Sequence, residues 1–174
     1  MTTEVGNALN DITEATARAV AQDPGNAAVV FAASGRPEGT VGTVVTAGRH
    51  TVRVDEPPSL GGDDTAANPV EVYLAALIAC HTVTYRFWAQ RLGIAVADLA
   101  IEAEGDLDVR GFFGLDDAVR PGFQKVRLTV RVTGPESADR YAELHRAVEK
   151  HCPVLDLTAA PTPVESTLVT TVSA

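Results

Sequence analysis

Residues 68–93 read NPVEVYLAALIACHTVTYRFWAQRLG, a run with the signals of a helix start, a long apolar middle and a helix end. It opens in the order that favours a helix start, with Asn68 as the N-cap and Pro69 at the first helical position. Glu71 stands where its side chain can close a capping box with the N-cap residue. Gly93 supplies a left-handed stop. The pattern therefore predicts a helix that ends at Leu92, immediately before this glycine.

Within this helix, residues 70–83 present apolar or small side chains on nearly every face. A helix of that kind must be covered on most sides, so we expect it to be the core helix. Cys80 lies in its middle, too far from the N-terminus for the helix dipole to lower the thiol pKa. Burial alone raises a thiol pKa and leaves the group inert. A reactive Cys80 therefore needs a nearby cation, preferably an arginine, which stays charged when desolvated.

The rest of the chain predicts clustered strands and two further helices. In order, the predicted elements are a helix within residues 1–24, strands at 27–33, 41–47 and 50–54, a loop at 57–64, the core helix, strands at 99–103 and 126–132, a helix at 141–152 and a closing strand at 164–172. Strands that cluster without regular alternation with helices favour an α+β fold. We expect one domain over residues 1–174, with residues 1–24 as an N-terminal helical extension.

Length and charge limit the classes of function. A chain of 174 residues fits one globular domain. Its 14 basic and 23 acidic side chains give a net charge of −9, which disfavours nucleic acid and anionic membranes as partners. No apolar stretch approaches the roughly 20 residues of a membrane span. The first residues lack the pattern of a signal peptide, so the sequence predicts a cytoplasmic protein.

Cys80 and Cys152 are the only cysteines, and they form no CxxC pair. This excludes a disulfide-dense scaffold and a zinc ribbon. Cys152 continues the apolar stripe of its helix four residues after Val148, so both thiols are predicted to face the interior. His81 follows Cys80 and His151 precedes Cys152, so the four side chains could be considered as the ligands of a zinc site. Adjacent helical residues diverge by about 100°, however, so His81 is expected to point away when Cys80 faces the site, and we predict no metal.

Several short motifs lie between residues 40 and 171. They are Asp55-Glu56-Pro57, Gly61-Gly62-Asp63, Asn68-Pro69-x-Glu71, Ala75-Ala76-Leu77-x-Ala79-Cys80, Gly105-Asp106-x-Asp108-x-Arg110-Gly111, Arg120-Pro121-Gly122-Phe123 and Cys152-Pro153-Val154. In this combination the sequence resembles the OsmC/Ohr family of osmotically induced and organic hydroperoxide resistance proteins. The two cysteine contexts are the most specific part of the resemblance.

The resemblance implies both a fold and an activity. The fold is a two-layer α+β arrangement with mixed or antiparallel sheets, assembled as an intertwined homodimer with active sites at the interface. The activity is a cysteine-based peroxidase that reduces organic hydroperoxides to alcohols without a cofactor or metal. By position, Cys80 matches the peroxidatic cysteine and Cys152 the resolving one. A sulfenic acid on Cys80 would then condense with Cys152 to a disulfide, which an external dithiol reduces.

The resemblance also implies two helper residues. The founding members carry a glutamate ten residues before the cysteine, where this chain has Val70; Glu71 stands nine before it, as in other OsmC-like relatives. Nine helical residues place Glu71 on the face opposite Cys80 and about 13.5 Å along the axis. Glu71 would therefore act from the partner subunit or through another residue, or only cap the helix. The activating arginine belongs to the N-terminal strand region, where Arg49 is preferred and Arg36 is second.

Two other functions remain open at this point. One is a non-catalytic OsmC-like dimer whose cavity binds a small hydrophobic ligand, and the other is a structural stress-associated dimer. The complete cysteine pair favours the peroxidase, since a binding protein does not need it. Four aromatic residues are candidates to line an apolar pocket, although core packing is the commoner role: Phe87, Trp88, Phe112 and Phe113. Asp106, Asp108 and Arg110 are interpreted as a turn network.

Overall fold

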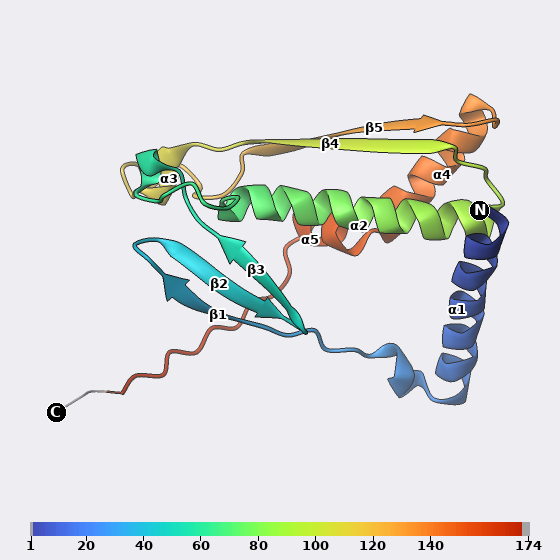
Figure 1. Ribbon diagram of the computed structural model, residues 1–174, viewed down its shortest axis with the longest axis horizontal. Helices are drawn as coiled ribbons and strands as arrows, with labels where there is room; N and C mark the ends of the chain where they lie inside the picture. Colours follow the sequence, from blue (N-terminus) through green and yellow to red (C-terminus); the bar gives the residue numbers. More distant parts are fainter. Residues whose placement is uncertain (1, 172–174) are drawn as a thin grey trace.

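The computed structural model describes residues 2–171, with side chains from residue 8 onward. Its elements are α1 (Thr2–Gln22), η1 (Pro24–Ala27), β1 (Ala33–Glu38), β2 (Gly42–Ala47), β3 (His50–Val54), η2 (Pro58–Leu60), α2 (Pro69–Leu92), β4 (Asp98–Asp106), α3 (Val109–Phe112), β5 (Lys125–Thr133), α4 (Ala138–His151) and α5 (Pro153–Ala159). The strands form two antiparallel sheets, β1-β2-β3 and β4-β5 (Figure 1). The α+β prediction is confirmed.

Helix α2 begins and ends where its sequence predicts. The Asn68 side chain accepts a hydrogen bond from the Glu71 N–H at 2.9 Å, and the Glu71 carboxylate accepts one from the Asn68 N–H at 2.9 Å. This is the predicted capping box. Gly93 ends the helix in the left-handed region, at φ 62°. Both ends are determined by local side-chain chemistry, so the helix bounds follow from the sequence alone.

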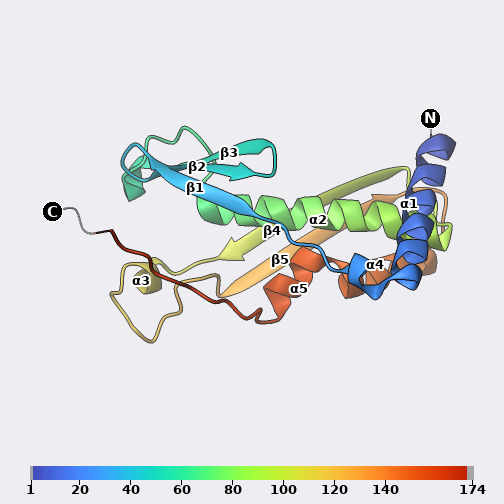
Figure 2. The ribbon, with the colours of Figure 1, turned by 90° about the horizontal axis from the view of Figure 1, so that it is seen from below.

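The core lies between α2, the β4–β5 sheet and α4. The β4–β5 layer runs along one side of α2, and α4 and α5 pack beside it (Figures 1 and 2). Tyr85 of α2 is buried against Leu144 and Val148 of α4. Exposure alternates residue by residue along β4, as the period-two pattern predicts. On the exposed face, Arg127 pairs with Asp106 and Glu104 across the two strands.

The β1–β3 sheet stands apart from this core. All six residues of β1 are exposed, and so are four of the five residues of β3. Figure 1 shows the sheet beside the N-terminal half of α2, on the side away from β4 and β5. The strand predicted at 27–33 is therefore largely wrong, because β1 spans Ala33–Glu38. The apolar side chains of Val29, Val30 and Phe31 are exposed, so no packing surface holds that segment in a ladder.

The predicted closing strand at 164–172 is also wrong for its described part. Residues 164–171 form no strand, and residue 172 lies outside the described residues. Val164, Leu168 and Val169 are each more than four-fifths exposed. The alternating apolar pattern is present, but within this chain these side chains have no surface to pack on, and the pattern alone cannot fix a ladder.

Helix α2 is not enclosed on most sides within one chain, contrary to prediction. Ala75, Ala76, Ala79 and Val83 are exposed; we call these four residues the open face of α2. The face is apolar and spans two turns of the longest helix. In the described part of the chain, no helix has the length and apolar character needed to cross a bilayer.

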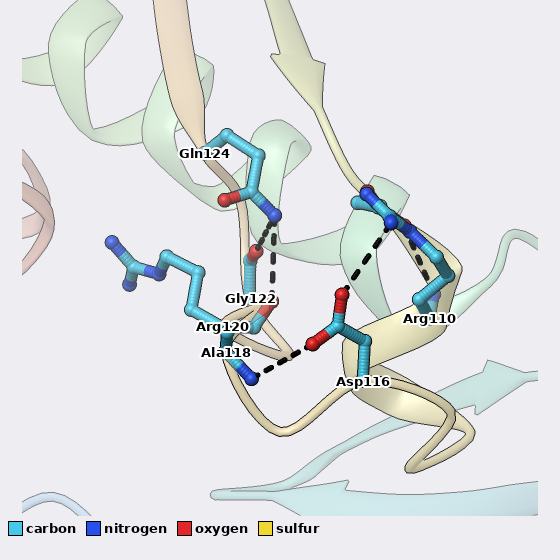
Figure 3. Close-up of polar contacts among 7 residues, drawn as sticks. Arg110, Asp116, Ala118, Arg120, Gly122 and Gln124 are labelled. Atoms are coloured by element: carbon cyan, nitrogen blue, oxygen red, sulfur yellow. Dashed lines mark hydrogen bonds and ion pairs between the residues drawn. The ribbon is translucent and has the colours of Figure 1, made fainter.

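The segment between β4 and β5 is held by a polar turn network (Figure 3). Asp108 accepts a hydrogen bond from the Arg110 guanidinium at 2.6 Å, and Arg110 also lies 3.5 Å from Asp116. Asp116 in turn accepts from the N–H of Ala118 at 3.0 Å. Asp108 and Arg110 therefore act structurally, as expected. Their partner in the predicted network, Asp106, instead pairs with β5.

Candidate functional site

The structure brings the two cysteines together. Cys80 lies half-buried in the middle of α2, and Cys152, only 1% exposed, lies at the junction of α4 and α5. The two thiols are free, and Cys80 is close enough to Cys152 to raise the pKa of the Cys152 thiol. Both thiols were expected to face the interior, and both lie where the end of α4 packs against α2.

A break between two helices places Cys152 at this point. Its N–H donates to the Val148 carbonyl at 2.9 Å and closes α4, while its own carbonyl accepts from the Asp156 N–H at 3.0 Å and opens α5. Pro153 cannot extend α4 but suits the first position of α5. The predicted helix end at residue 152 agrees with α4 to within one residue, whereas α5 was not predicted.

His81 contacts the same thiol. Its Nδ1 lies 3.2 Å from the Sγ of Cys152, and the side chain is only 1% exposed. The expectation that His81 points away from the cysteine site is therefore wrong. Neighbouring helical side chains do diverge, but Cys152 approaches from another element and lies between Cys80 and His81, so it contacts both. The missed signal was a histidine next to a cysteine on a predicted core helix.

Burial sets the charge state of this pair. Burial raises the pKa of the Cys152 thiol, and the hydrogen bond to Cys80 raises it further, against lowering contributions from the Leu155 N–H and Thr84. Burial also lowers the pKa of His81, helped by His145. At neutral pH, Cys152 is therefore a protonated thiol and His81 a neutral imidazole.

A row of polar side chains continues from His81 toward the surface. Its ring lies beside the ring of Tyr85, with centroids 6.4 Å apart. The Tyr85 hydroxyl is 2.5 Å from Nδ1 of His145, whose Nε2 is 3.5 Å from the Glu149 carboxylate. Burial raises the pKa of Tyr85 to about 12, so this hydroxyl keeps its proton. The buried histidine thus has polar neighbours on α4 as well as on its own helix.

A cavity of about 390 Å³ opens beside Cys80. It is lined by Thr13 of α1, by Cys80, Val83, Thr84, Phe87, Trp88 and Arg91 of α2, and by His151 and Pro153. An adjoining groove of about 590 Å³ runs between α1 and Phe87. Phe87 and Trp88 thus line a pocket, as two of the candidate aromatics. The other two, Phe112 and Phe113, are exposed on and beside α3 and do not line it.

The predicted helper residues are not at the thiol pair. Arg49 lies in the turn between β2 and β3, Arg36 lies on β1, and neither lines the cavity. Glu71 is engaged in the capping box of α2. Arg91 is the sole cation among the described lining residues, but it stands three helical turns, about 16 Å, beyond Cys80. Its guanidinium stacks 4.9 Å above the Trp88 ring.

The histidines considered for zinc take different roles. His151 stacks on Trp88, with ring centroids 4.2 Å apart, whereas His81 faces Cys152. Among residues 2–171, no group of three or more histidine, cysteine, aspartate or glutamate side chains is arranged to hold a metal ion.

Comparisons with solved structures show the same fold in bacterial proteins. An OsmC-like protein from Mycoplasma pneumoniae superposes with a TM-score of 0.66 at 16% identity, covering 76% of this chain and 89% of its own. An organic hydroperoxide resistance protein from Legionella pneumophila gives 0.58 at 22% identity, covering 74% and 88%. The organic hydroperoxide resistance protein OhrB of Bacillus subtilis gives 0.52 at 22%, covering 76% and 93%.

Sequence comparison assigns the family. No curated protein matches the chain at a significant level. The family model described as OsmC-like protein matches residues 61–167, which include α2, both cysteines and the whole packed core. The chain therefore belongs to the family of OsmC-like proteins.

Proposed function

We propose that this protein is a thiol peroxidase that reduces organic hydroperoxides to alcohols. The observation that carries the proposal is the position of Cys80, which lines a cavity with apolar and aromatic walls and is close enough to Cys152 to raise the pKa of its thiol. Two free thiols in contact, one half-buried beside a cavity and the other buried behind it, suit a nucleophile and a resolving group. Two of the structural relatives are named as organic hydroperoxide resistance proteins, which supports the same chemistry.

The proposed reaction has two oxidative steps. The Cys80 thiolate attacks the terminal oxygen of the hydroperoxide and the O–O bond breaks, so Cys80 becomes a sulfenic acid. The alkoxide that leaves takes up a proton from water and becomes the alcohol. Cys152 then attacks the Cys80 sulfur, and the sulfenic oxygen leaves as water. An external dithiol reduces the resulting disulfide by exchange. A reducing compartment such as the cytoplasm supplies such dithiols.

A second copy of the chain completes the site in this proposal. Cys80 needs a cation, and Arg91, the one arginine among the described residues that line its cavity, stands about 16 Å along the helix from it. The open face of α2 and the exposed β1–β3 sheet offer apolar and strand surfaces for a partner. Arg49, or failing that Arg36, is proposed to reach Cys80 from the partner subunit. Glu71 is proposed to assist across the same interface, in addition to capping α2.

The two cysteines provide the test. Cys80→Ser should abolish consumption of cumene hydroperoxide even in a single turnover, because the nucleophile is gone. Cys152→Ser is the matched control: it should consume about one equivalent and then stall, or oxidise further to sulfinic acid when external thiol is scarce. Peptide mass spectrometry should show a Cys80–Cys152 disulfide only in the parent. Equal rates for both variants and the parent would contradict the proposal.

The cavities favour one second candidate function, a non-catalytic dimer that binds a small hydrophobic ligand. The cavity of about 390 Å³ at Cys80 falls in the size range of small-molecule sites, and the adjoining groove extends it. If both cysteines stay reduced under excess organic hydroperoxide while the protein binds a fluorescent apolar probe, this candidate replaces the peroxidase.

A further inference from the structure

The proposed reaction leaves one buried group without a task. Cys152 must lose its proton before its sulfur can attack Cys80, yet burial raises its thiol pKa and keeps the proton in place. Water has little access, because the cysteine is 1% exposed. The nearest group that can accept a proton is His81, at 3.2 Å from Nδ1 to Sγ. At this distance the two atoms are within hydrogen-bonding range.

We propose that His81 is the catalytic base of the resolving step, taking the Cys152 proton through Nδ1 as the Cys152 sulfur attacks Cys80. This inference rests on the proposed peroxidase function and deepens it. It gives a role to His81, which takes no part in the two oxidative steps as proposed above. Because Nδ1 contacts the reacting sulfur directly, His81 acts on the chemistry itself and not through another side chain.

The surroundings of His81 suit a base. To accept at Nδ1 the ring must carry its hydrogen on Nε2, and its lowered pKa keeps it neutral near pH 7. The titratable groups that face it are Cys152 at the end of α4, Tyr85 on its own helix, and His145 and Glu149 on α4. Glu149 opposes the lowering, so the imidazolium formed during the reaction has a counter-charge.

The step balances in atoms and electrons. The S–H bond of Cys152 breaks and its proton moves to Nδ1. The Cys152 sulfur lone pair then forms the S–S bond while the S–O bond of the Cys80 sulfenic acid breaks. The departing oxygen takes up the proton from the imidazolium and leaves as water, which returns His81 to its neutral form. The oxidant is the organic hydroperoxide that formed the sulfenic acid.

The experiment isolates this step from peroxide chemistry. Cys80 is loaded as a mixed disulfide with thionitrobenzoate, and Cys152 displaces this coloured thiol as the Cys80–Cys152 disulfide closes. His81→Asn keeps a polar atom near Nδ1 but supplies no base at neutral pH. We expect it to release the thiol roughly 10²-fold more slowly than the parent, at the lower end of general base effects. His50→Asn, on the exposed strand β3, is the matched control and should close at the parental rate.

The pH dependence of the closure rate distinguishes loss of the base from a structural effect of the substitution. The parental closure rate should rise through a pKa below the usual 6.5 of histidine and then level, since the neutral imidazole is the active form. His81→Asn should lack this plateau and rise with hydroxide up to the thiol pKa. His81→Gln serves as the second variant if the first does not fold. The proposal would be overturned if His81→Asn closed the disulfide at the parental rate, or if it closed more slowly but kept the plateau in its pH profile.

The two proposals fail in different ways. If peroxide leaves both cysteines reduced but His81→Asn still slows the release of thionitrobenzoate, the peroxidase is lost and the base role of His81 stands for disulfide closure. If peroxide is consumed by the parent and by His81→Asn alike, and closure is also unchanged, the peroxidase stands and the role of His81 is lost.

Discussion

The two halves of this molecule differ in how much of their own surface they bury. The half built from α2, β4, β5 and α4 closes around Tyr85, Leu144 and Val148 and holds both thiols. The half built from β1, β2 and β3 has regular antiparallel registers but an almost entirely exposed first strand. Backbone hydrogen bonds thus hold together a sheet in which no strand residue is fully buried, whereas side-chain burial defines the core.

The difference separates the chemistry as well. The two cysteines, the proposed base His81 and the cavity at Cys80 lie in the packed half. The two candidate arginines, Arg36 and Arg49, lie in the exposed half. The thiol pair therefore lies within one chain, whereas neither candidate arginine lines the cavity at Cys80. In the proposed dimer, the exposed sheet of one copy would supply an arginine to the thiol pair of the other.

The largest expected effect is on the stability of the packed half. Leu144→Ala removes a side chain with 0% exposure and should lower the free energy of unfolding by about 2–5 kcal/mol. Val52→Ala, at 37% exposure on β3, should cost less than about 1 kcal/mol at dilutions where the protein is monomeric. Urea titrations give both values. Equal losses at such dilution would mean that the β1–β3 sheet packs as firmly as the core.

Next comes assembly through the open face of α2. Ala76→Glu places a charge on that face and should weaken a homodimer about hundredfold, because a buried charge without a partner is strongly unfavourable. Light scattering should then show a mass near the 18.2 kDa of one chain. Ala142→Glu, at an exposed alanine of α4, should leave the assembly unchanged. A dimer in both variants would locate the interface elsewhere.

A smaller effect is expected on the nucleophile. Arg49→Ala should slow both alkylation of Cys80 and peroxide reduction about tenfold near neutral pH, since a neighbouring cation favours the thiolate. Initial rates with iodoacetamide and with cumene hydroperoxide measure this. Arg36→Ala is the matched comparison and should stay near the parental rates. If only Arg36→Ala slows these rates, Arg36 and not Arg49 is the arginine that activates Cys80.

The smallest effect concerns the connection between the halves. Asp55 follows β3 and accepts hydrogen bonds from the backbone of Thr65 and Asp63 and from the Thr65 hydroxyl, in the loop that leads to α2. The Thr65 N–H contributes most to lowering the pKa of Asp55 from 3.8 to about 2. A lowered carboxyl pKa stabilises the fold above the unfolded value, and this stabilisation is lost as pH falls from 3.8 through about 2.

Asp55→Asn should therefore be less stable than the parent at neutral pH, with the difference shrinking over that acid window. Thermal unfolding at a series of pH values measures it, and Asp64→Asn, in the same loop, is the control. A difference that stays constant down to pH 2 would show that the Asp55 charge does not hold the loop.

Local signals account for what the sequence could predict. The caps of α2 and the period-two pattern of β4 and β5 depend on neighbours in sequence, so their elements appear close to the predicted positions. The first strand was predicted at 27–33 from its apolar content, but β1 begins at Ala33 because pairing with β2 determines where it starts. The base at the thiol pair was missed because the contact of His81 exists only once α4 has delivered Cys152 to α2.

The junction at Cys152 has a consequence for the unfolded chain. Once joined to Cys80, it would close a covalent ring that contains β4, β5 and α4, so the packed half would be tied together by its first and last elements. A ring of this length removes chain entropy from the denatured state worth about 4 kcal/mol in the polymer estimate. Catalytic oxidation would then double as a stability switch, with the oxidised protein unfolding at higher urea concentration than the reduced one.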